Sequence, residues 1–460
     1  MTTTIDGNRK WCPNLALFGD SNFALFSSST LLVFSFLISL FIDGNLQNPL
    51  VRWWNISPTE IAYRQLGPTP NIAPAKIFQI DYQNDELVSP EMQEAFDRDG
   101  VIAIRGLLDL DLLKLLDDTT TNMILKKKEN IKTKEKKKPR VLTGRKKNPT
   151  QFFTVNQGAI FSSLIDKNST VSTSDVSPFV KVAMMSSIPR VVANLLHFDD
   201  CDTCANKTLR ILRDIFLAKD GEEYVCGYHV DDLGFWPALA EKPAGDIGIN
   251  AWVALDDMPI KNGGGFALAV GSHSASWKEE AYNLTGSTHS FPDGGFQSAR
   301  DVLDNRPGNG TCNIQYTAPH LHRRMEETKR VYDIRYGDVI FHTRWLFHRT
   351  VPFHRDVVSQ RFTDKEDPLL YRRYSIRYGP GATSIIPNGW STEPSVISEE
   401  KNGGRTADDV SQYDAAWYPR VWPSISELEL EQMKILAKER LPTALVTSEQ
   451  RKRVTRPRLK

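Results

Sequence analysis

The sequence has almost no net charge and few cysteines, and both shortages narrow what the protein can be. Its 57 Lys and Arg residues balance 56 Asp and Glu residues to a net charge of +1, so there is no overall attraction to nucleic acid or to an anionic membrane. Only one C-x-x-C pair occurs, at Cys201 and Cys204, which excludes a four-cysteine zinc site of the usual spacing. No internal repeat of about 20 to 50 residues is present, which argues against a solenoid or a propeller.

The remaining composition is that of an ordinary globular protein. Hydrophobic residues make up 40% of the 460 residues and charged residues 25%, which is enough apolar material for a sizeable core. The chain is longer than one average domain, but barrel and sandwich folds often reach this length as single domains.

One long apolar run lies near the N-terminus, from Phe23 to Ile42. Its 20 residues contain no charge, and this length matches a helix that crosses about 30 Å of hydrocarbon. Arg9 and Lys10 precede the run and Asp43 follows it. This distribution of charge predicts that residues 1–22 form a tail in the cytosol. We therefore expect residues 23–42 to be a transmembrane or signal-anchor helix, with a cleaved signal peptide as the alternative.

Sequons and cysteines support a lumenal location for the rest of the chain. Five N-x-S/T sequons lie beyond the apolar run, and their glycosylation requires a secretory compartment. Four of the 5 cysteines also lie beyond it and could form two disulfides there, although Cys201 and Cys204 could instead be a redox pair or half of a zinc site. The sequons begin at Asn55, Asn168, Asn206, Asn283 and Asn309, and the four cysteines are Cys201, Cys204, Cys226 and Cys312, whereas Cys12 precedes the run. These features predict a single-pass ER or Golgi membrane glycoprotein, with secretion as the alternative.

Changes in composition divide the chain beyond the apolar run. Residues 43–75 carry five of the prolines and are predicted to be a stem, residues 76–422 the folded domain, and residues 423–460 a helix, from Glu427 to Arg440, with a basic tail. Within the domain, residues 126–147 hold 12 Lys or Arg and two Glu. So charged a segment favours a disordered surface loop, with a contact to a polyanion or lipid headgroup as the alternative.

The pattern of apolar residues predicts a mainly β domain. Residues 91–99 are predicted to form a helix that Gly100 ends, followed by a strand at 101–104 and an apolar helix at 107–116. Further elements are expected as a helix at 189–196, a strand or short helix at 209–218, and strands at 247–255, 266–270, 339–341 and 371–378. Short strands separated by Gly and Asp turns indicate an α+β fold, mainly β with flanking helices, whose core is a double-stranded β-helix or cupin-like jelly roll.

Histidine and aspartate in an H-x-D pattern indicate a metal site. Non-haem Fe(II) oxygenases hold iron with two His and one carboxylate. The pattern occurs three times, and only His229-Val230-Asp231 follows an extended stretch and has histidines far downstream. His197-Phe-Asp ends an apolar helical run, and no histidine follows His354-Arg-Asp. The second histidine is predicted to be His348, beyond the strand launched by Gly337-Asp338, with His342 as the alternative.

In this order the motifs resemble those of the phytanoyl-CoA dioxygenase family. The resemblance extends from about Pro90 to Tyr378 and is interrupted by the lysine-rich insert. It includes Phe96-Asp-Arg-Asp-Gly-Val-Ile-Ala-Ile-Arg-Gly-Leu-Leu, His229-Val-Asp231, Asn262-Gly-Gly with Gly271-Ser-His273, Gly337-Asp338 with His348, and finally Arg373.

The resemblance implies a cofactor set and a role for each matched residue. His229, Asp231 and His348 would be the Fe(II) ligands and catalytic residues. Arg373 would hold the distal carboxylate of 2-oxoglutarate, because a guanidinium pairs bidentately with a carboxylate, and Lys219 would lie near this cosubstrate. O2 would be the second cosubstrate, and ascorbate is a further candidate cofactor.

One departure from the family pattern concerns the arginine. It usually follows the last histidine by roughly ten residues, whereas residues 356–370 are predicted to be a polar loop inserted before Arg373. Arg377 shares the face of Arg373 on the predicted strand and is its rival, and Arg372 points to the other face.

For several neighbouring residues a structural role is as good an explanation as a functional one. Asn262-Gly263-Gly264-Gly265 is predicted to be a loop that needs positive φ, because no P-loop Lys-Ser/Thr follows. Asp256-Asp257 is predicted to be a turn at a strand end. His273 could be a surface residue or a neighbour of the metal ligands. Phe235 and Trp236 could line a substrate pocket or pack in the core.

The resemblance thus implies a 2-oxoglutarate-dependent dioxygenase. The expected reaction is hydroxylation of a small-molecule, lipid-like or secretory-pathway substrate, with no specific nucleic-acid partner, and Asp231 argues against halogenation because related halogenases leave that position small. Two alternatives from other classes are a catalytically silent lumenal binding or scaffold protein and a zinc hydrolase. A hydrolase would not need the carboxylate clamp that Arg373 offers.

Overall fold

The computed structural model describes a β domain in the second of two compact units, residues 49–460. The residues described are 74–80, 87–137, 153–155, 176–198, 207–219, 227–230, 248–278, 280–281, 314, 318–354, 357, 371–383, 406–408, 418–433 and 435. Asp231, Phe235, Trp236, all five sequons, all 5 cysteines and residues 1–73 lie outside them, so the predictions for those residues stay predictions. In the described part of the chain, no helix has the length and apolar character needed to cross a membrane.

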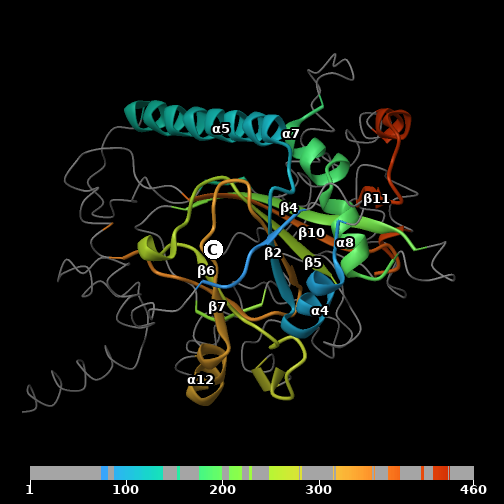
Figure 1. The fold of residues 1–460 in the computed structure, drawn as a ribbon. Helices are drawn as coiled ribbons and strands as arrows, with labels where there is room; N and C mark the ends of the chain where they lie inside the picture. The colour runs from blue at the N-terminus through green and yellow to red at the C-terminus, as the bar shows by residue number, and fades with distance from the viewer. Residues whose placement is uncertain are drawn as a thin grey trace, which may run out of the picture. The chain divides into compact units, whose positions relative to one another are not determined.

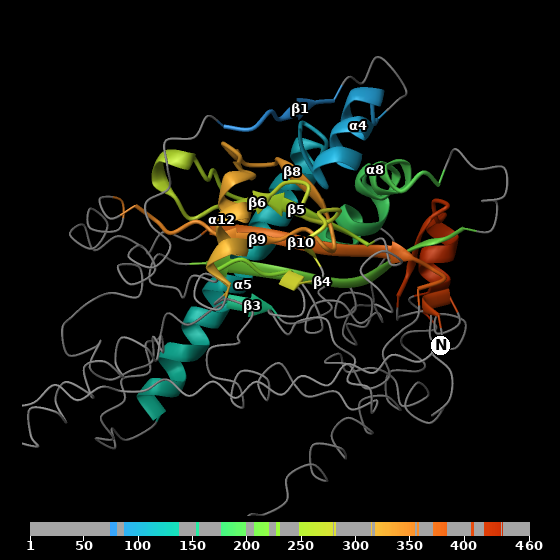
Figure 2. The same cartoon turned by 90° about the horizontal axis from the view of Figure 1, so that it is seen from below.

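Two β-sheets form the domain. The larger has the strand order β1-β2-β8-β5-β10-β4-β11, with β3 also paired to β4, and the smaller has the order β7-β6-β9 (Figures 1 and 2). The strands of the larger sheet are β1 (Phe78–Gln79), β2 (Val101–Arg105), β3 (Phe153–Val155), β4 (Leu209–Lys219), β5 (Ile249–Ala254), β8 (Val339–Thr343), β10 (Tyr371–Pro380) and β11 (Arg420–Trp422). Those of the smaller sheet are β6 (Phe266–Ala269), β7 (Lys329–Val331) and β9 (His348–Thr350).

The side chains of β10 alternate between the two faces of the larger sheet, as predicted. Tyr374 and Ile376 belong to the large core cluster on the outer face of this sheet. Tyr371 belongs to a second cluster that includes Phe266 and Leu268 of the smaller sheet, so this cluster lies between the two sheets. Antiparallel pairing with β4 and β5 on either side fixes the register of β10. The two facing sheets confirm a mainly β fold with a cupin-like core.

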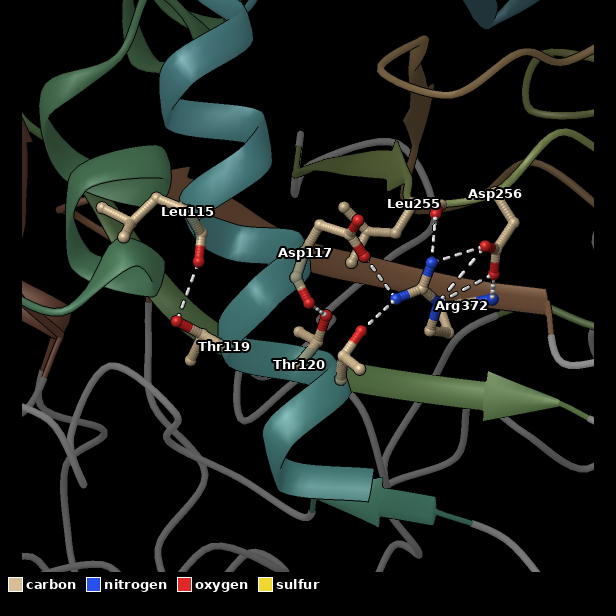
Figure 3. Close-up of polar contacts among 8 residues, drawn as sticks. Leu115, Asp117, Thr119, Thr120, Leu255, Asp256 and Arg372 are labelled. Carbon is tan, nitrogen blue, oxygen red and sulfur yellow. Dashed lines mark hydrogen bonds and ion pairs between the residues drawn. The ribbon is translucent and has the colours of Figure 1, made fainter. Parts of the chain in front are cut away.

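Helices cover the outer face of the larger sheet. They are α4 (Pro90–Asp99), α5 (Leu110–Lys137), α7 (Pro178–Val180), the π-helix η2 (Lys181–Met185) and α8 (Ile188–Leu195). α5 supplies Leu113 and Leu116 to the outer core cluster. It is also tied to the sheet by Arg372, which pairs with Asp117 of α5 and donates from Nη2 to Asp256 at 2.6 Å (Figure 3).

α12 (Pro319–Glu327) covers the outer side of the smaller sheet, across the domain from α5 (Figure 1). Leu321 and Met325, one helical turn apart, pack in a third core cluster with Phe347 and Ala269. This helix was not predicted, because these two residues are the only apolar positions in an otherwise polar stretch apart from its first proline. The domain therefore has helices outside both sheets.

Glycines with positive φ form two of the turns that the sequence predicted. Gly100 ends α4 with φ 73° and its N–H donates to the carbonyl of Phe96, as predicted. Gly263 and Gly264 have φ 71° and 81°, which confirms the predicted loop of positive φ. A Cβ on Gly263 would lie 2.0 Å from the carbonyl oxygen of Pro352, so only glycine allows this loop to contact the segment after β9.

Two predicted boundaries were wrong. α5 starts at Leu110 rather than Leu107 and continues to Lys137, so the first half of the insert at 126–147 is helical rather than a disordered loop. Lys and Glu are good helix formers, and a helix already packed at one end extends at little cost.

The C-terminal helix begins at Glu427 as predicted, because the Ser426 hydroxyl accepts from the N–H of Glu429 at 3.2 Å while the Glu429 carboxylate accepts from the N–H of Ser426 at 2.8 Å.

Candidate metal centre

Two of the three predicted metal ligands face each other across a backbone bridge. The N–H of His229 donates to the carbonyl of His348 at 2.9 Å, and the N–H of His348 donates to the carbonyl of His229 at 2.9 Å. In an antiparallel pair, residues that exchange both bonds stand directly opposite, with side chains on the same face. Their ring centres are 4.4 Å apart, so the fold brings together two histidines that are distant in the sequence.

The backbone also determines which ring nitrogen of each histidine can bind a metal. Nδ1 of His229 lies 2.8 Å from the carbonyl of Gly227, and Nδ1 of His348 lies 3.1 Å from the carbonyl of Leu346. A carbonyl oxygen only accepts, so each Nδ1 carries the proton and Nε2 of the neutral ring carries the lone pair. A metal-binding histidine has this arrangement, and the donor chemistry of the pair therefore fits Fe(II).

His342, the alternative second histidine, lies close to this pair. Its ring centre is 5.1 Å from that of His348, and it is buried on β8, with Nδ1 2.9 Å from the carbonyl of Thr343. It reaches the pair from the larger sheet, whereas His229 and His348 share one backbone bridge. The bridge explains how His348 can share a metal with His229. His342 lies next to this pair but is not part of the bridge.

The third predicted ligand, Asp231, lies one residue beyond the last described residue of this segment, Val230. Within the described residues, no group of three or more His, Cys, Asp or Glu side chains could hold a metal ion. A His–His–Asp site would therefore be completed from Asp231, which stays a prediction.

The structure places the other two H-x-D histidines outside the bridge. His197 lies at the end of α8 with φ 55°, its side chain is 52% exposed, and Nε2 lies 3.7 Å from Asp97. This is the solvated helix end predicted for it. His354 follows β9, and its N–H donates to the carbonyl of Asn262 at 2.9 Å.

Arg373 extends from β10 toward the core between the sheets. Its guanidinium carbon lies 5.8 Å from the ring centre of Trp252. Trp252 packs against Phe266 at 4.7 Å, and Phe266 in turn packs against His348 at 6.3 Å. A continuous row of rings thus connects Arg373 to the histidine pair, and nothing in its sequence spacing revealed this row.

The rival, Arg377, shares the inner face of β10 and is 2% exposed. It pairs in register with Asn250 of β5, which in turn pairs with His342 of β8. Lys219 is the last residue of β4, and its backbone pairs with Tyr371 at the start of β10. Lys219 and Arg373 are therefore at the same end of the β4–β10 pair, while Arg377 lies in the row of His342.

The structure also shows the positions of Asp256 and His273, for which the sequence allowed either a structural or a functional role. Asp256 accepts from the backbone N–H and the guanidinium of Arg372 at 2.7 and 2.6 Å, as expected for a strand-end turn rather than an acid/base pair. Arg372 points away from Arg373, as predicted. His273 is half-buried against Gly100, and burial lowers the pKa of its imidazole.

The motifs and the histidine bridge can be compared with known proteins. Residues 96–355, more than half of the chain, match the family model described as phytanoyl-CoA dioxygenase. The chain belongs to this family. The match starts inside α4, includes both bridge histidines and ends before β10, so Arg373 lies beyond it. The comparison with curated proteins gives no match.

Several solved structures resemble the chain at low identity. They include the non-heme alpha ketoglutarate dependent carbocyclase SnoK from nogalamycin biosynthesis, with 16% identity, a TM-score of 0.35 and coverage of 65% of this chain and 87% of that one. HygX from Streptomyces hygroscopicus, with nickel and 2-oxoglutarate bound, has 15% identity, a TM-score of 0.35 and coverage of 70% and 99%. The epimerase SnoN, in complex with Fe3+, alpha ketoglutarate and nogalamycin RO, has 15% identity, a TM-score of 0.35 and coverage of 69% and 91%.

Family membership establishes the type of enzyme and its cofactors. The chain is an oxygenase-type enzyme that uses Fe(II) and 2-oxoglutarate, as the resemblance implied. The histidine pair offers the ligand type that such a site requires. Neither the family nor the fold chooses a substrate.

Proposed function

We propose that the protein is an Fe(II)- and 2-oxoglutarate-dependent dioxygenase that hydroxylates a small-molecule, lipid-like or secretory-pathway substrate. His229, Asp231 and His348 would hold the iron. The observation that carries the proposal is the reciprocal backbone bridge between His229 and His348, with both Nδ1 atoms on carbonyl oxygens. Each imidazole, in its neutral form, thereby presents the Nε2 lone pair on the same face, where a carboxylate can complete a facial triad.

Arg373 would hold the distal carboxylate of 2-oxoglutarate, with Lys219 near the same end of β10. Iron, once bound with 2-oxoglutarate and O2, supplies the oxidising chemistry. The tasks of the protein are to fix the ligand geometry, clamp the cosubstrate and exclude water. The apolar rings of Trp252 and Phe266 between Arg373 and His348 support the last two tasks. They exclude water, and they leave a low-dielectric environment in which a guanidinium–carboxylate pair is strong.

We also propose that residues 23–42 anchor the enzyme in an endomembrane with the catalytic domain in the lumen. The uncharged 20-residue run and the five sequons beyond it support this location. A lumenal site would make acyl-CoA a poor candidate substrate and favours lipid-like, peptide or glycan acceptors.

The first test is binding of Fe(II) and 2-oxoglutarate without O2. We expect the wild-type protein to develop the weak visible charge-transfer band of an iron–oxo-acid chelate, and to release succinate when O2 is admitted. His229→Ala should lose both signals. His197→Ala removes a histidine of the same H-x-D pattern at an exposed helix end and should keep both. Absence of the band from correctly folded wild-type protein would overturn the proposal.

A further inference from the structure

An ion cluster packs against the back of the histidine bridge. Successive residues of an extended segment point to opposite faces, so Tyr228 and Arg349, the neighbours of His229 and His348, point away from the predicted metal. α12 covers that face. The two segments that carry the histidines therefore have a second set of contacts, on the side where no metal binds.

Glu326, on the last turn of α12, is the centre of this cluster. Its Oε1 accepts from Nε of Arg349 at 2.7 Å, and its Oε2 pairs with Nζ of Lys329 on β7. The Arg349 side chain is 1% exposed and that of Lys329 2%, whereas that of Glu326 is 25% exposed. One carboxylate thus pairs with two almost fully buried cationic side chains.

Tyr228 connects the segment of His229 to the same turn of α12. Its hydroxyl donates to the carbonyl of Met325, the residue before Glu326, at 3.3 Å. Its ring lies beneath the guanidinium of Arg349, with 5.5 Å between the guanidinium carbon and the ring centre. Both histidine-bearing segments are therefore attached to adjacent residues of one helix and to each other.

The carboxylate of Glu326 is charged at neutral pH. Burial opposes the ionisation of Glu326, but the charges and hydrogen bonds of Arg349 and Lys329 outweigh it and lower the pKa of Glu326 to about 2. Glu326 and Arg349 therefore form an ion pair at neutral pH, while burial lowers the pKa of Lys329.

We propose that Glu326 is a positioning residue for the iron centre, which holds Arg349 and Tyr228 on α12 and thereby sets the separation of His348 and His229. This role rests on the proposed function. Removing the carboxylate would leave Arg349 and Lys329 buried side by side without a counter-charge, and such a pair relaxes by moving apart. A shift of the Arg349 backbone also moves His348, its neighbour in the chain.

The test is the affinity for Fe(II), measured by anaerobic titration in the presence of 2-oxoglutarate with the charge-transfer band as the signal. We expect Glu326→Gln to weaken Fe(II) binding by about 10-fold, the lower end of the loss seen when a direct outer contact to a metal ligand is removed, and to shift the band. Lys329→Met is the matched control. It disrupts the same cluster and lowers thermal stability, but β7 carries no predicted ligand, so the Fe(II) affinity should stay within about twofold of wild type.

A second variant covers the case in which Glu326→Gln does not fold. Glu326→Gln combined with Arg349→Met and Lys329→Met removes the contact without leaving either cation buried and uncompensated, and should weaken Fe(II) binding to a similar extent. If the folded variants keep wild-type Fe(II) affinity and an unchanged band, Glu326 is a structural residue only and the proposal is wrong. Failure of the wild-type protein to bind Fe(II) would instead overturn the proposed function, and this role with it.

Discussion

The inner and outer sides of the two sheets carry polar side chains that serve different purposes. On β10, Arg373 points inward to Trp252, while its neighbour Arg372 points outward to Asp256 and to α5. On β9, His348 points to the predicted metal, while its neighbour Arg349 points outward to α12. In both strands one step along the backbone separates a binding group from an anchoring group.

This alternation explains how a reactive centre can be held rigidly. A strand presents every second residue to each face. In β9, with only three residues, a helix that holds the outer residue also fixes the inner one, whereas β10 is fixed along its length by its pairing with β4 and β5. Arg372 forms ion pairs with two carboxylates, and Arg349 forms one with a carboxylate that it shares with Lys329. Substitutions on the inner side should therefore change binding, whereas those on the outer side of β10 should change stability.

The largest effect is expected on the inner side of β10. Arg373→Met should weaken 2-oxoglutarate binding by about 100-fold, because a charge-assisted contact to a carboxylate contributes about 1.5–3 kcal/mol. The Fe(II) affinity and the free energy of unfolding should change little. Titration of the Fe(II)-loaded protein with 2-oxoglutarate measures this. If Arg377→Met produces the loss and Arg373→Met does not, the clamp is Arg377, in the row of His342.

The outer side of β10 should show the opposite profile. Arg372→Met removes the contacts to Asp256, Asp117 and the carbonyl of Leu255, and we expect the free energy of unfolding to fall by about 2 kcal/mol. Urea denaturation of the variant measures the change. The affinity for 2-oxoglutarate should match that of wild type, and a large loss of affinity would mean that the two faces of β10 are not independent.

Sequence patterns predicted this division on β10 but not on β9. Alternation over residues 371–378 was enough to place Arg372 and Arg373 on opposite faces. β9 has only three residues, too few for a periodic pattern, and its pairing with His229 comes from a contact between residues far apart in the chain. Order along the sequence pointed to His229 and His348, but only the bridge explains how they meet.

The sequence also did not predict the ion cluster of Glu326, Arg349 and Lys329. Glu326 lies in a polar stretch with two apolar side chains at helical spacing, and a charged residue in such a stretch normally faces solvent. Burial of Arg349 and Lys329 is decided by the packing of α12 on the smaller sheet. Local composition similarly gave the wrong structure for residues 126–137, because the helix is set by the packed residues before them.

The smallest expected effect is the pH dependence of the outer cluster on the smaller sheet. The pKa of Glu326 is lowered to about 2 in the folded protein from an ordinary value of 4.5. A lowered carboxyl pKa stabilises the fold above the unfolded-state value, and this stabilisation disappears as the pH falls from about 4.5 toward 2. After allowance for the partial exposure of the carboxylate, we expect it to contribute about 1–2 kcal/mol at pH 7.

Other carboxylates titrate in the same range, so the quantity to measure is the difference in unfolding free energy between wild type and Glu326→Gln. Urea denaturation at intervals from pH 7 to about pH 3 should show this difference shrinking as the pH falls. Glu280→Gln, which removes a 54%-exposed partner of His320, should give a small difference that does not follow the same course. A wild-type advantage over Glu326→Gln that stays constant down to pH 3 would mean that packing, rather than charge, attaches α12 to the strand that carries His348.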